Sequence, residues 1–197
     1  EPVGRQLAEQ GIVVAAPDLW GHGRSAGRRG DLGDLAACVH TVDALTRDVV
    51  LPRVGLRRYV AFGHSFGGLL AILWALARPP ALTRLIVQSP LLGFGFRVPP
   101  WKAMAATMLA TCWPAFRFPM GLDASALSHD PAVVQAYRTD PLVHQSITAR
   151  TYRSPSAIRR VQARISAQAS SAGASVSTSG VFVAHTPRAV QAGTSRL

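Results

Sequence analysis

A tight glycine-rich turn between an apolar run and an apolar helical segment constrains the fold of this chain more than any other feature. The turn is Gly63-His64-Ser65-Phe66-Gly67-Gly68, which follows Tyr59–Phe62 and precedes Leu69–Arg78. A serine between small residues in this context predicts a sharp corner with strained backbone angles and the hydroxyl at its apex. A Cβ at either flanking glycine is expected to collide with the strand or the helix, and Gly68 to relieve a further contact. The alternative is a glycine-rich surface turn with an exposed serine.

Two more apolar runs predict that this turn belongs to a parallel sheet. Ile12–Ala16 and Leu85–Val87 lack polar alternation, as Tyr59–Phe62 does, which is typical of strands buried on both faces. Apolar residues at helical spacing over 31–52 predict a helix that Pro52 ends. Strand, helix, strand, helix and strand in this order predict an α/β fold with parallel crossovers.

The composition changes after the third run. Residues 91–165 hold helical patches broken by prolines, without a β-branched strand run, which predicts a helical insertion. Residues 166–180 are almost entirely small or polar, and the run Val181–Ala184 after them fits one more strand. We expect three parts: a sheet core over 1–90, the helical insertion over 91–165, and a low-complexity basic tail over 166–197 that is disordered or read out of frame.

Charge and cysteine content exclude some classes of function. The net charge is +11, but residues 141–197 contain no carboxylate, and arginine is their only cation. The arginines are scattered or paired instead of forming a stripe with aromatic residues, so we expect no nucleic-acid partner, and binding through the basic tail is a lesser hypothesis. Cys38 and Cys112 have no metal-ligand spacing, which predicts no metal site and favours a reducing compartment.

The chain resembles the monoacylglycerol lipase and lysophospholipase family of α/β-hydrolases, which is also classed with the serine aminopeptidase S33 group. The likeness covers about residues 3–165, and Phe66 stands where the family usually has Met. The segments that carry it are 11–18, 21–25, 27–30, 63–68, 88–93, 98–102, 127–131, 136–137, 140–144 and 148–150.

The resemblance implies a partial α/β-hydrolase fold with a helical cap, and an esterase that cleaves acyl chains from glycerol or related alcohols. Ser65 is then the nucleophile. Because the turn ends at a helix N-terminus, the backbone N–H of Phe66 is the expected oxyanion-hole donor. No metal or organic cofactor is expected. The expected partner is a lipid-like small-molecule ester, and the expected location is the cytoplasm, with a peripheral membrane contact through the cap.

The cap carries apolar side chains suited to a lipid tail or a membrane interface. The alternative is ordinary packing in the core of the cap. The residues in question are Met104, Met108, Leu109, Trp113, Phe116 and Phe118.

A hydrolase of this fold needs an acid and a histidine after the serine. No carboxylate follows Asp140, and the surroundings of the late His185 do not match the family's histidine loop. Asp130, Asp140 and His144 have catalytic side-chain types, but the resemblance places them in the cap, where helix caps and salt bridges are expected. Pairing of Asp140 with His129 or His144 is a weaker alternative.

We therefore expect a chain that is truncated at both ends relative to the family. The segment with the second oxyanion donor precedes residue 1 in the family, so that donor has no candidate here. Ester hydrolysis through Ser65 is expected to be impaired or absent in these 197 residues. The alternative is a non-catalytic lipid-binding or interaction remnant. For the tail, an out-of-frame read is the hypothesis and a divergent ending the alternative.

Overall fold

The computed structural model describes residues 2–77, 79–92, 100–119, 123–152, 163 and 181–185. The chain divides into two compact units, the first made of residues 1–17, 39–95 and 156–197 and the second of 18–38 and 96–155. The domain bounds expected from the sequence remain a prediction.

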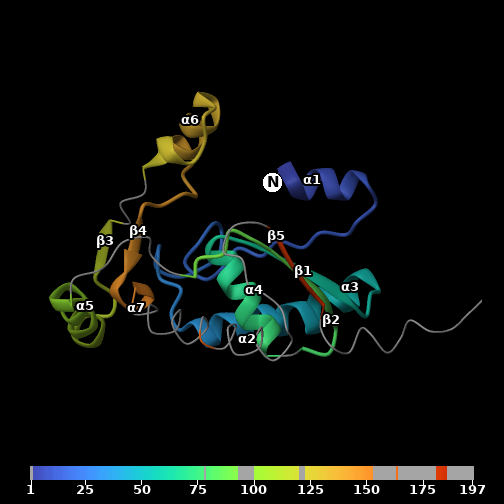
Figure 1. Ribbon diagram of the computed structural model, residues 1–197, viewed down its shortest axis with the longest axis horizontal. Helices are drawn as coiled ribbons and strands as arrows, with labels where there is room; N and C mark the ends of the chain where they lie inside the picture. The colour runs from blue at the N-terminus through green and yellow to red at the C-terminus, as the bar shows by residue number, and fades with distance from the viewer. Residues whose placement is uncertain are drawn as a thin grey trace, which may run out of the picture. The chain divides into compact units, whose positions relative to one another are not determined.

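A three-stranded sheet forms the centre of the first unit (Figure 1). Its order is β1 (Tyr59–His64), β2 (Leu82–Gln88) and β5 (Val181–His185). β1 and β2 are parallel and β5 is antiparallel to β2. The strands predicted around Tyr59–Phe62, Leu85–Val87 and Val181–Ala184 are thus confirmed, and β1 and β2 make the predicted parallel pair.

Helix α4 (Phe66–Leu76) follows β1 and packs against both parallel strands. It buries Leu69, Leu70 and Trp74 among other residues. The prediction that the strands are buried on both faces is wrong for β1, where Val60 is 49% exposed and Phe62 56% exposed. These two side chains alternate with the buried Ala61 and Gly63, so only one face of β1 is covered.

The first apolar run, Ile12–Ala16, does not form the predicted strand. It follows α1 (Pro2–Glu9) and the turn at Gly11, which has a φ of 76°. Ile12 and Val13 are more than half exposed. A strand exists through hydrogen bonds to a neighbouring strand, and no strand of the described residues pairs with this run.

The helix predicted over 31–52 starts later and ends later than expected. It consists of α2 (Leu35–Leu45), the π-helix η1 (Thr46–Val50) and α3 (Leu51–Val54). Asp34 precedes it, and its carboxylate accepts the N–H of Ala36 at 2.7 Å. Pro52 does not end the helix: it lies in the first turn of α3, directly after the π-helix η1. Gly55, at a φ of 69°, ends it.

Four helices lie in the described residues of the second unit that follow residue 96, within the stretch of the predicted insertion. Its helices are α5 (Pro100–Cys112), η2 (Ala124–Ala126), α6 (Pro131–Thr139) and α7 (Ala149–Tyr152). This part is not helical throughout, because β3 (Arg117–Pro119) and β4 (Ser146–Thr148) form an antiparallel pair that is separate from the three-stranded sheet. Each strand has three residues, which is too short to leave a β-branched run in the sequence.

A buried carboxylate joins the loop before α2 to the segment around β4 in the second unit. Asp31 is 4% exposed and pairs with the guanidinium of Arg150, whose Nε lies 3.1 Å from Oδ1. The same carboxylate accepts the N–H of Gly33 at 3.0 Å and the hydroxyl of Thr148 at 3.3 Å. Burial alone would raise the pKa of Asp31, but the bond from Arg150 and the other donors hold it below its usual value.

Candidate active site

Ser65 lies at the corner where β1 ends and α4 begins. β1 ends at His64 and α4 begins at Phe66. Ser65 has a φ of 52° and a ψ of −119°, outside the region that residues with a Cβ usually adopt. Its side chain is exposed. The strained corner with an accessible hydroxyl that the sequence predicts is therefore present.

The backbone of this corner is held by the neighbouring strand. The N–H of Ser65 donates to the carbonyl of Gln88 at 3.1 Å, and its carbonyl accepts the N–H of Leu91 at 2.9 Å. The same carbonyl accepts the N–H of Leu69 inside α4 at 3.2 Å. No hydrogen bond of the Ser65 hydroxyl is seen within the described residues. The main chain is thus fixed, while the hydroxyl stays free to attack a ligand.

Sequence reasoning gave Gln88 and Leu91 no role at this corner. Their position could have indicated this role, because Gln88 ends β2, which runs parallel to β1, the strand before Ser65. Ser89, between them, also has a positive φ, 41°, and an exposed side chain.

Of the three glycines around the corner, Gly63 is sterically required and Gly68 leaves little room for a side chain. A Cβ on Gly63 would lie 2.7 Å from the carbonyl carbon of Gly67, and one on Gly68 would lie 3.0 Å from Pro90. The expected collision at Gly67 is wrong, because no atom of the described residues lies within 4 Å of the place its Cβ would take. Gly67 is the second residue of α4, and its missing side chain points into open space.

The N-terminus of α4 supplies a hydrogen-bond donor beside the serine. The first N–H groups of a helix have no acceptor inside the helix, and the helix dipole is positive at this end. Among the described residues, no acceptor for the Phe66 N–H is seen. Such an N–H group can stabilise negative charge on a ligand that lies beside it.

The other candidate acids and histidines have local roles in the second unit. Asp130 caps α6 by accepting the N–H of Ala132 at 2.8 Å, and Asp140 accepts the N–H of Leu142 at 2.8 Å. This confirms the expected capping role for Asp130, whereas a turn and not a helix follows Asp140, and neither carboxylate makes a salt bridge within the described residues. His129 is exposed, and the ring of His144 lies against that of His22, 4.7 Å between centroids.

The register of the sheet separates His185 from the serine corner. His185 pairs with Arg84 in the β2–β5 ladder, whereas Ser65 binds the carbonyl of Gln88. These positions on β2 are four residues apart, or about 13 Å at the rise of an extended strand. The backbone therefore gives no support to His185 as the base for Ser65.

The described residues hold no cluster of three His, Cys, Asp or Glu side chains that fits a metal ion. Cys38 and Cys112 are both free thiols, and burial raises the pKa of Cys38. None of the described helices is long and apolar enough to cross a membrane.

Comparison with known proteins agrees with this geometry. A family model described as serine aminopeptidase, S33, matches residues 1–178. The monoacylglycerol lipase of Mycolicibacterium smegmatis is 33% identical over 142 residues, which are 72% of this chain and 50% of that protein. Phospholipase YtpA of Bacillus subtilis is 30% identical over 147 residues, 73% of this chain and 54% of that protein. The crystal structure of the Paleococcus ferrophilus monoacylglycerol lipase matches with a TM-score of 0.69 at 30% identity, covering 81% of this chain and 60% of that one.

The chain spans about half the length of the curated relatives it matches. Its parallel strands and the helix after the serine turn form part of an α/β-hydrolase fold, as its structural neighbour shows. Since the family model covers most of the residues, this chain belongs to the serine aminopeptidase S33 family of α/β-hydrolases.

Proposed function

We propose that Ser65 is the nucleophile of a carboxylic ester hydrolase of the monoacylglycerol lipase or lysophospholipase type. The observation that carries the proposal is an exposed hydroxyl on a positive-φ corner, next to an N–H without an acceptor at a helix N-terminus. This combination supports the assignment of a nucleophile and an oxyanion donor to the adjacent residues Ser65 and Phe66.

The chemistry follows from that pair. The Ser65 oxygen adds to the ester carbonyl, and the negative charge that forms on the carbonyl oxygen is stabilised by the Phe66 N–H. Collapse of the tetrahedral intermediate releases the alcohol and leaves an acyl group on Ser65, which water then hydrolyses. The proton of the serine hydroxyl passes to a base and from there to the departing alcohol.

The 197 residues do not supply that base in a recognisable form. No carboxylate follows Asp140, and His185 is the only histidine after His144. Removing the histidine or the acid of such a triad usually costs several powers of ten in rate. We therefore expect the chain by itself to turn over esters very slowly.

The proposed substrate is a lipid ester. Relatives named as a monoacylglycerol lipase and a phospholipase support this class. Helix α5 supports it as well, because it exposes its large apolar side chains. Trp101, Met104 and Met108 are each more than 60% exposed, whereas Ala110 on the opposite side is 5% exposed.

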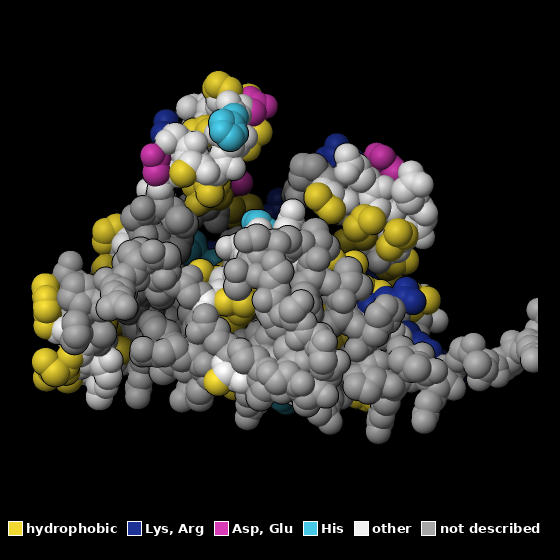
Figure 2. All heavy atoms as spheres, viewed as in Figure 1, with side chains coloured by type: hydrophobic (Ala, Val, Ile, Leu, Met, Phe, Trp, Pro, Cys, Tyr) yellow, Lys and Arg dark blue, Asp and Glu magenta, His cyan; other side chains and the backbone are white. Residues whose placement is uncertain are grey.

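The spacing of these exposed residues of α5 puts them on one stripe of the helix. Figure 2 shows hydrophobic side chains gathered at the surface over α5. Trp113 is also exposed and packs edge to face with Phe116, at 5.4 Å between ring centroids. Their exposure favours a contact with lipid over packing in the core of the cap, so we propose that this face meets a membrane or micelle surface.

Labelling with a fluorophosphonate probe tests the proposed nucleophile. We expect a single covalent adduct at Ser65, located by mass spectrometry, which disappears in Ser65→Ala. Ser89→Ala is the matched control, because Ser89 is also exposed and has a positive φ, and it should label like the wild type. A folded chain without an adduct at Ser65 would favour the non-catalytic remnant.

A further inference from the structure

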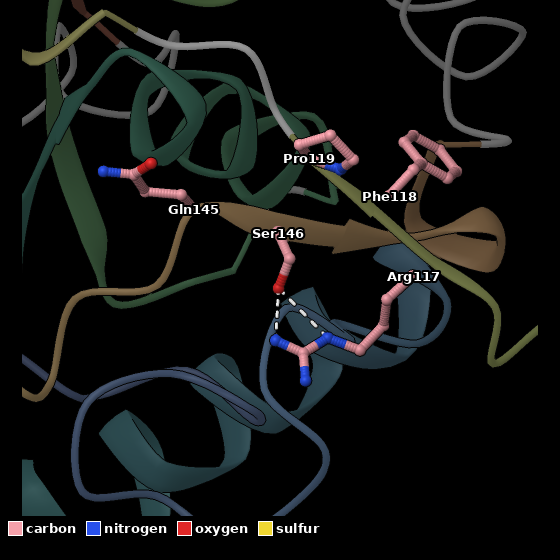
Figure 3. Close-up of a pocket in the computed structure, with 5 residues that line it drawn as sticks. All are labelled: Arg117, Phe118, Pro119, Gln145 and Ser146. Carbon is pink, nitrogen blue, oxygen red and sulfur yellow. Dashed lines mark hydrogen bonds between the residues drawn. The ribbon is translucent and has the colours of Figure 1, made fainter.

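An open pocket with a cationic side chain lies in the second unit, between β3 and the segment that leads into β4 (Figure 3). Its volume is about 490 Å³. The lining residues are Arg117, Phe118, Pro119, Gln145 and Ser146. Figure 3 shows the Arg117 guanidinium and the Ser146 hydroxyl together on one side of the two strands, while the side chains of Gln145 and Phe118 point away from them.

The charge of Arg117 is not neutralised by a carboxylate in the described residues. Its Nε donates to the hydroxyl oxygen of Ser146 at 3.0 Å, and its Nη2 donates to the same oxygen. Among the described residues, carboxylates pair with Arg47 and Arg150, through Asp48 and Asp31, but not with Arg117. A neutral hydroxyl in place of a carboxylate leaves a full positive charge in the pocket.

A pair of histidines includes the neighbour in sequence of one of the pocket residues. His144 precedes Gln145, and its Nδ1 lies 2.9 Å from the carbonyl of Ser146. Its Nε2 is buried and has no hydrogen-bond partner within the described residues. Its ring lies 4.7 Å from that of His22, whose own Nδ1 is 3.0 Å from the carbonyl of Trp20.

A second arginine reaches the same region from the loop before α2. Arg29 donates to the carbonyls of Gly23 and Ser25, at 2.6 and 2.9 Å. Its neighbour Gly30 lies directly against β4, where a Cβ would be 2.9 Å from the carbonyl carbon of Ser146. The loop that carries His22 and Arg29 is therefore packed on the strand that forms the pocket.

The positive charges act on His144. Burial, His22, Arg117 and Arg29 together lower the pKa of its imidazole, and the hydrogen bond to Ser146 only partly offsets them. These are the titratable and charged groups that act on this ring, and all of them are cationic when protonated. The region thus has a positive potential that an anion would relieve.

We propose that this pocket, which we call the Arg117 pocket, binds a tetrahedral oxyanion of the phosphate or sulfate type. Arg117 supplies a charged fork of donors, and the hydroxyl of Ser146 beside it adds a neutral donor. The ligand class is a phosphate monoester or a phospholipid headgroup. This binding does not depend on the chemistry of Ser65.

Sulfate is the first probe, because it keeps the same charge from pH 8 to pH 5. Isothermal titration of the full chain is expected to show saturable sulfate binding that Arg117→Gln weakens at least tenfold. The matched control is Arg138→Gln, which removes the same charge from an exposed position on α6 of the same unit and should leave the affinity unchanged. Equal losses in the two variants, or no saturable binding in the wild type, would overturn the proposal.

The pH dependence has a defined sign. A bound anion favours the imidazolium form of His144 and so raises its pKa. Sulfate binding is therefore expected to tighten as the pH falls through the pKa of His144, and the His144 resonances in NMR should titrate at higher pH with sulfate present. An affinity that does not change between pH 8 and pH 5 would contradict the role given to the histidines.

Two further arms control for folding and identify the source of the oxyanion. If Arg117→Gln does not fold, Arg117→Lys keeps the charge without the planar fork, and it should bind sulfate several-fold more weakly than the wild type. Unchanged binding in Arg117→Lys would contradict recognition by the fork.

Glycerol 3-phosphate and phosphatidylglycerol vesicles then distinguish a soluble ester from a lipid headgroup. The ligand that the wild type binds should bind more weakly to Arg117→Gln, and its affinity for Arg138→Gln should be unchanged.

Discussion

The serine corner and the Asp31 region are both well fixed, but by different means. At the corner, main-chain hydrogen bonds of Ser65 to Gln88 and Leu91 hold the backbone, and the glycines allow strand and helix to approach each other closely. Around Asp31 a single buried carboxylate collects donors from Arg150, Thr148 and Gly33. The Ser65 hydroxyl therefore makes no hydrogen bond within the described residues, whereas both oxygens of the Asp31 carboxylate accept hydrogen bonds.

This difference explains why one region is suited to chemistry and the other to structure. A reactive hydroxyl has to be unbonded before a substrate arrives, so its position must come from the backbone. A buried carboxylate, in contrast, is tolerated only when its lone pairs are filled. Substitutions should therefore affect the two regions differently. An added methyl group should destabilise the corner, and removal of a charge should destabilise the Asp31 region.

The largest expected effect is in the Asp31 region. Asp31→Ala removes the carboxylate and leaves Arg150 and two buried donors without their acceptor, so we expect a loss of about 3 kcal/mol in the free energy of unfolding. Urea denaturation followed by circular dichroism measures it. The control is Asp48→Ala, which breaks an exposed ion pair and should cost less than about 1 kcal/mol. Similar losses in both variants would show that burial of Asp31 does not matter.

The same carboxylate predicts a dependence on pH. Its pKa is lowered in the folded state, so its contribution to stability is present above the unfolded value of about 3.9 and is lost as the pH falls through the folded value. The stability difference between the wild type and Asp31→Asn should therefore be constant near neutral pH and shrink below about pH 4. A difference that grows on acidification would contradict the ion pair.

The next effect separates two glycines of the corner. Gly63→Ala forces a methyl group into the backbone of Gly67, and we expect a loss of about 2 to 3 kcal/mol. Gly67→Ala meets open space inside a helix and should be neutral or stabilise by up to about 1 kcal/mol. Thermal unfolding of both variants measures the contrast. If Gly67→Ala were the more damaging change, the geometry of the turn would be wrong.

A smaller effect concerns the exposed stripe of α5. The double substitution Met104→Gln and Met108→Gln should reduce binding to lipid vesicles roughly tenfold, because two apolar side chains lose their transfer to lipid. Co-sedimentation with vesicles measures it. Val133→Gln is the control, since it removes an apolar side chain that is 51% exposed on α6. An equal reduction in the control would indicate non-specific adsorption.

The smallest effect is at the start of α2. Asp34→Ala removes a cap that accepts the N–H groups of Ala36 and Ala37, and we expect a loss of about 1 kcal/mol. Asp34→Asn keeps the acceptor and should recover most of the stability in the same urea titration.

The sequence predicted the corner well because its geometry depends on neighbours in the chain. Strand, glycine, serine and helix are consecutive, and each imposes a local backbone preference. Ile12–Ala16 shows the limit of such reasoning. It has the same apolar pattern as β1, but β1 has a parallel partner in β2 and this run has no partner among the described strands. A strand depends on its neighbour, which periodicity does not reveal.

Long-range contacts account for the other differences. β3 and β4 pair across nearly thirty residues, and Asp31 meets Arg150 from far along the chain. Neither pairing leaves a signal in a short window of sequence. The helix over 31–52 was misplaced for a local reason, since Pro52 occupies a first turn that tolerates proline instead of the end of a helix.

Chemical rescue by imidazole tests the central proposal about Ser65 most directly. If this serine is a competent nucleophile that lacks only its base, free imidazole should accept its proton, and the rate of fluorophosphonate labelling at Ser65 should rise in proportion to the imidazole concentration. Ser65→Ala should show no labelling at any concentration, and Ser89→Ala should behave as the wild type. A folded chain whose Ser65 remains unlabelled at high imidazole would contradict the hydrolase account.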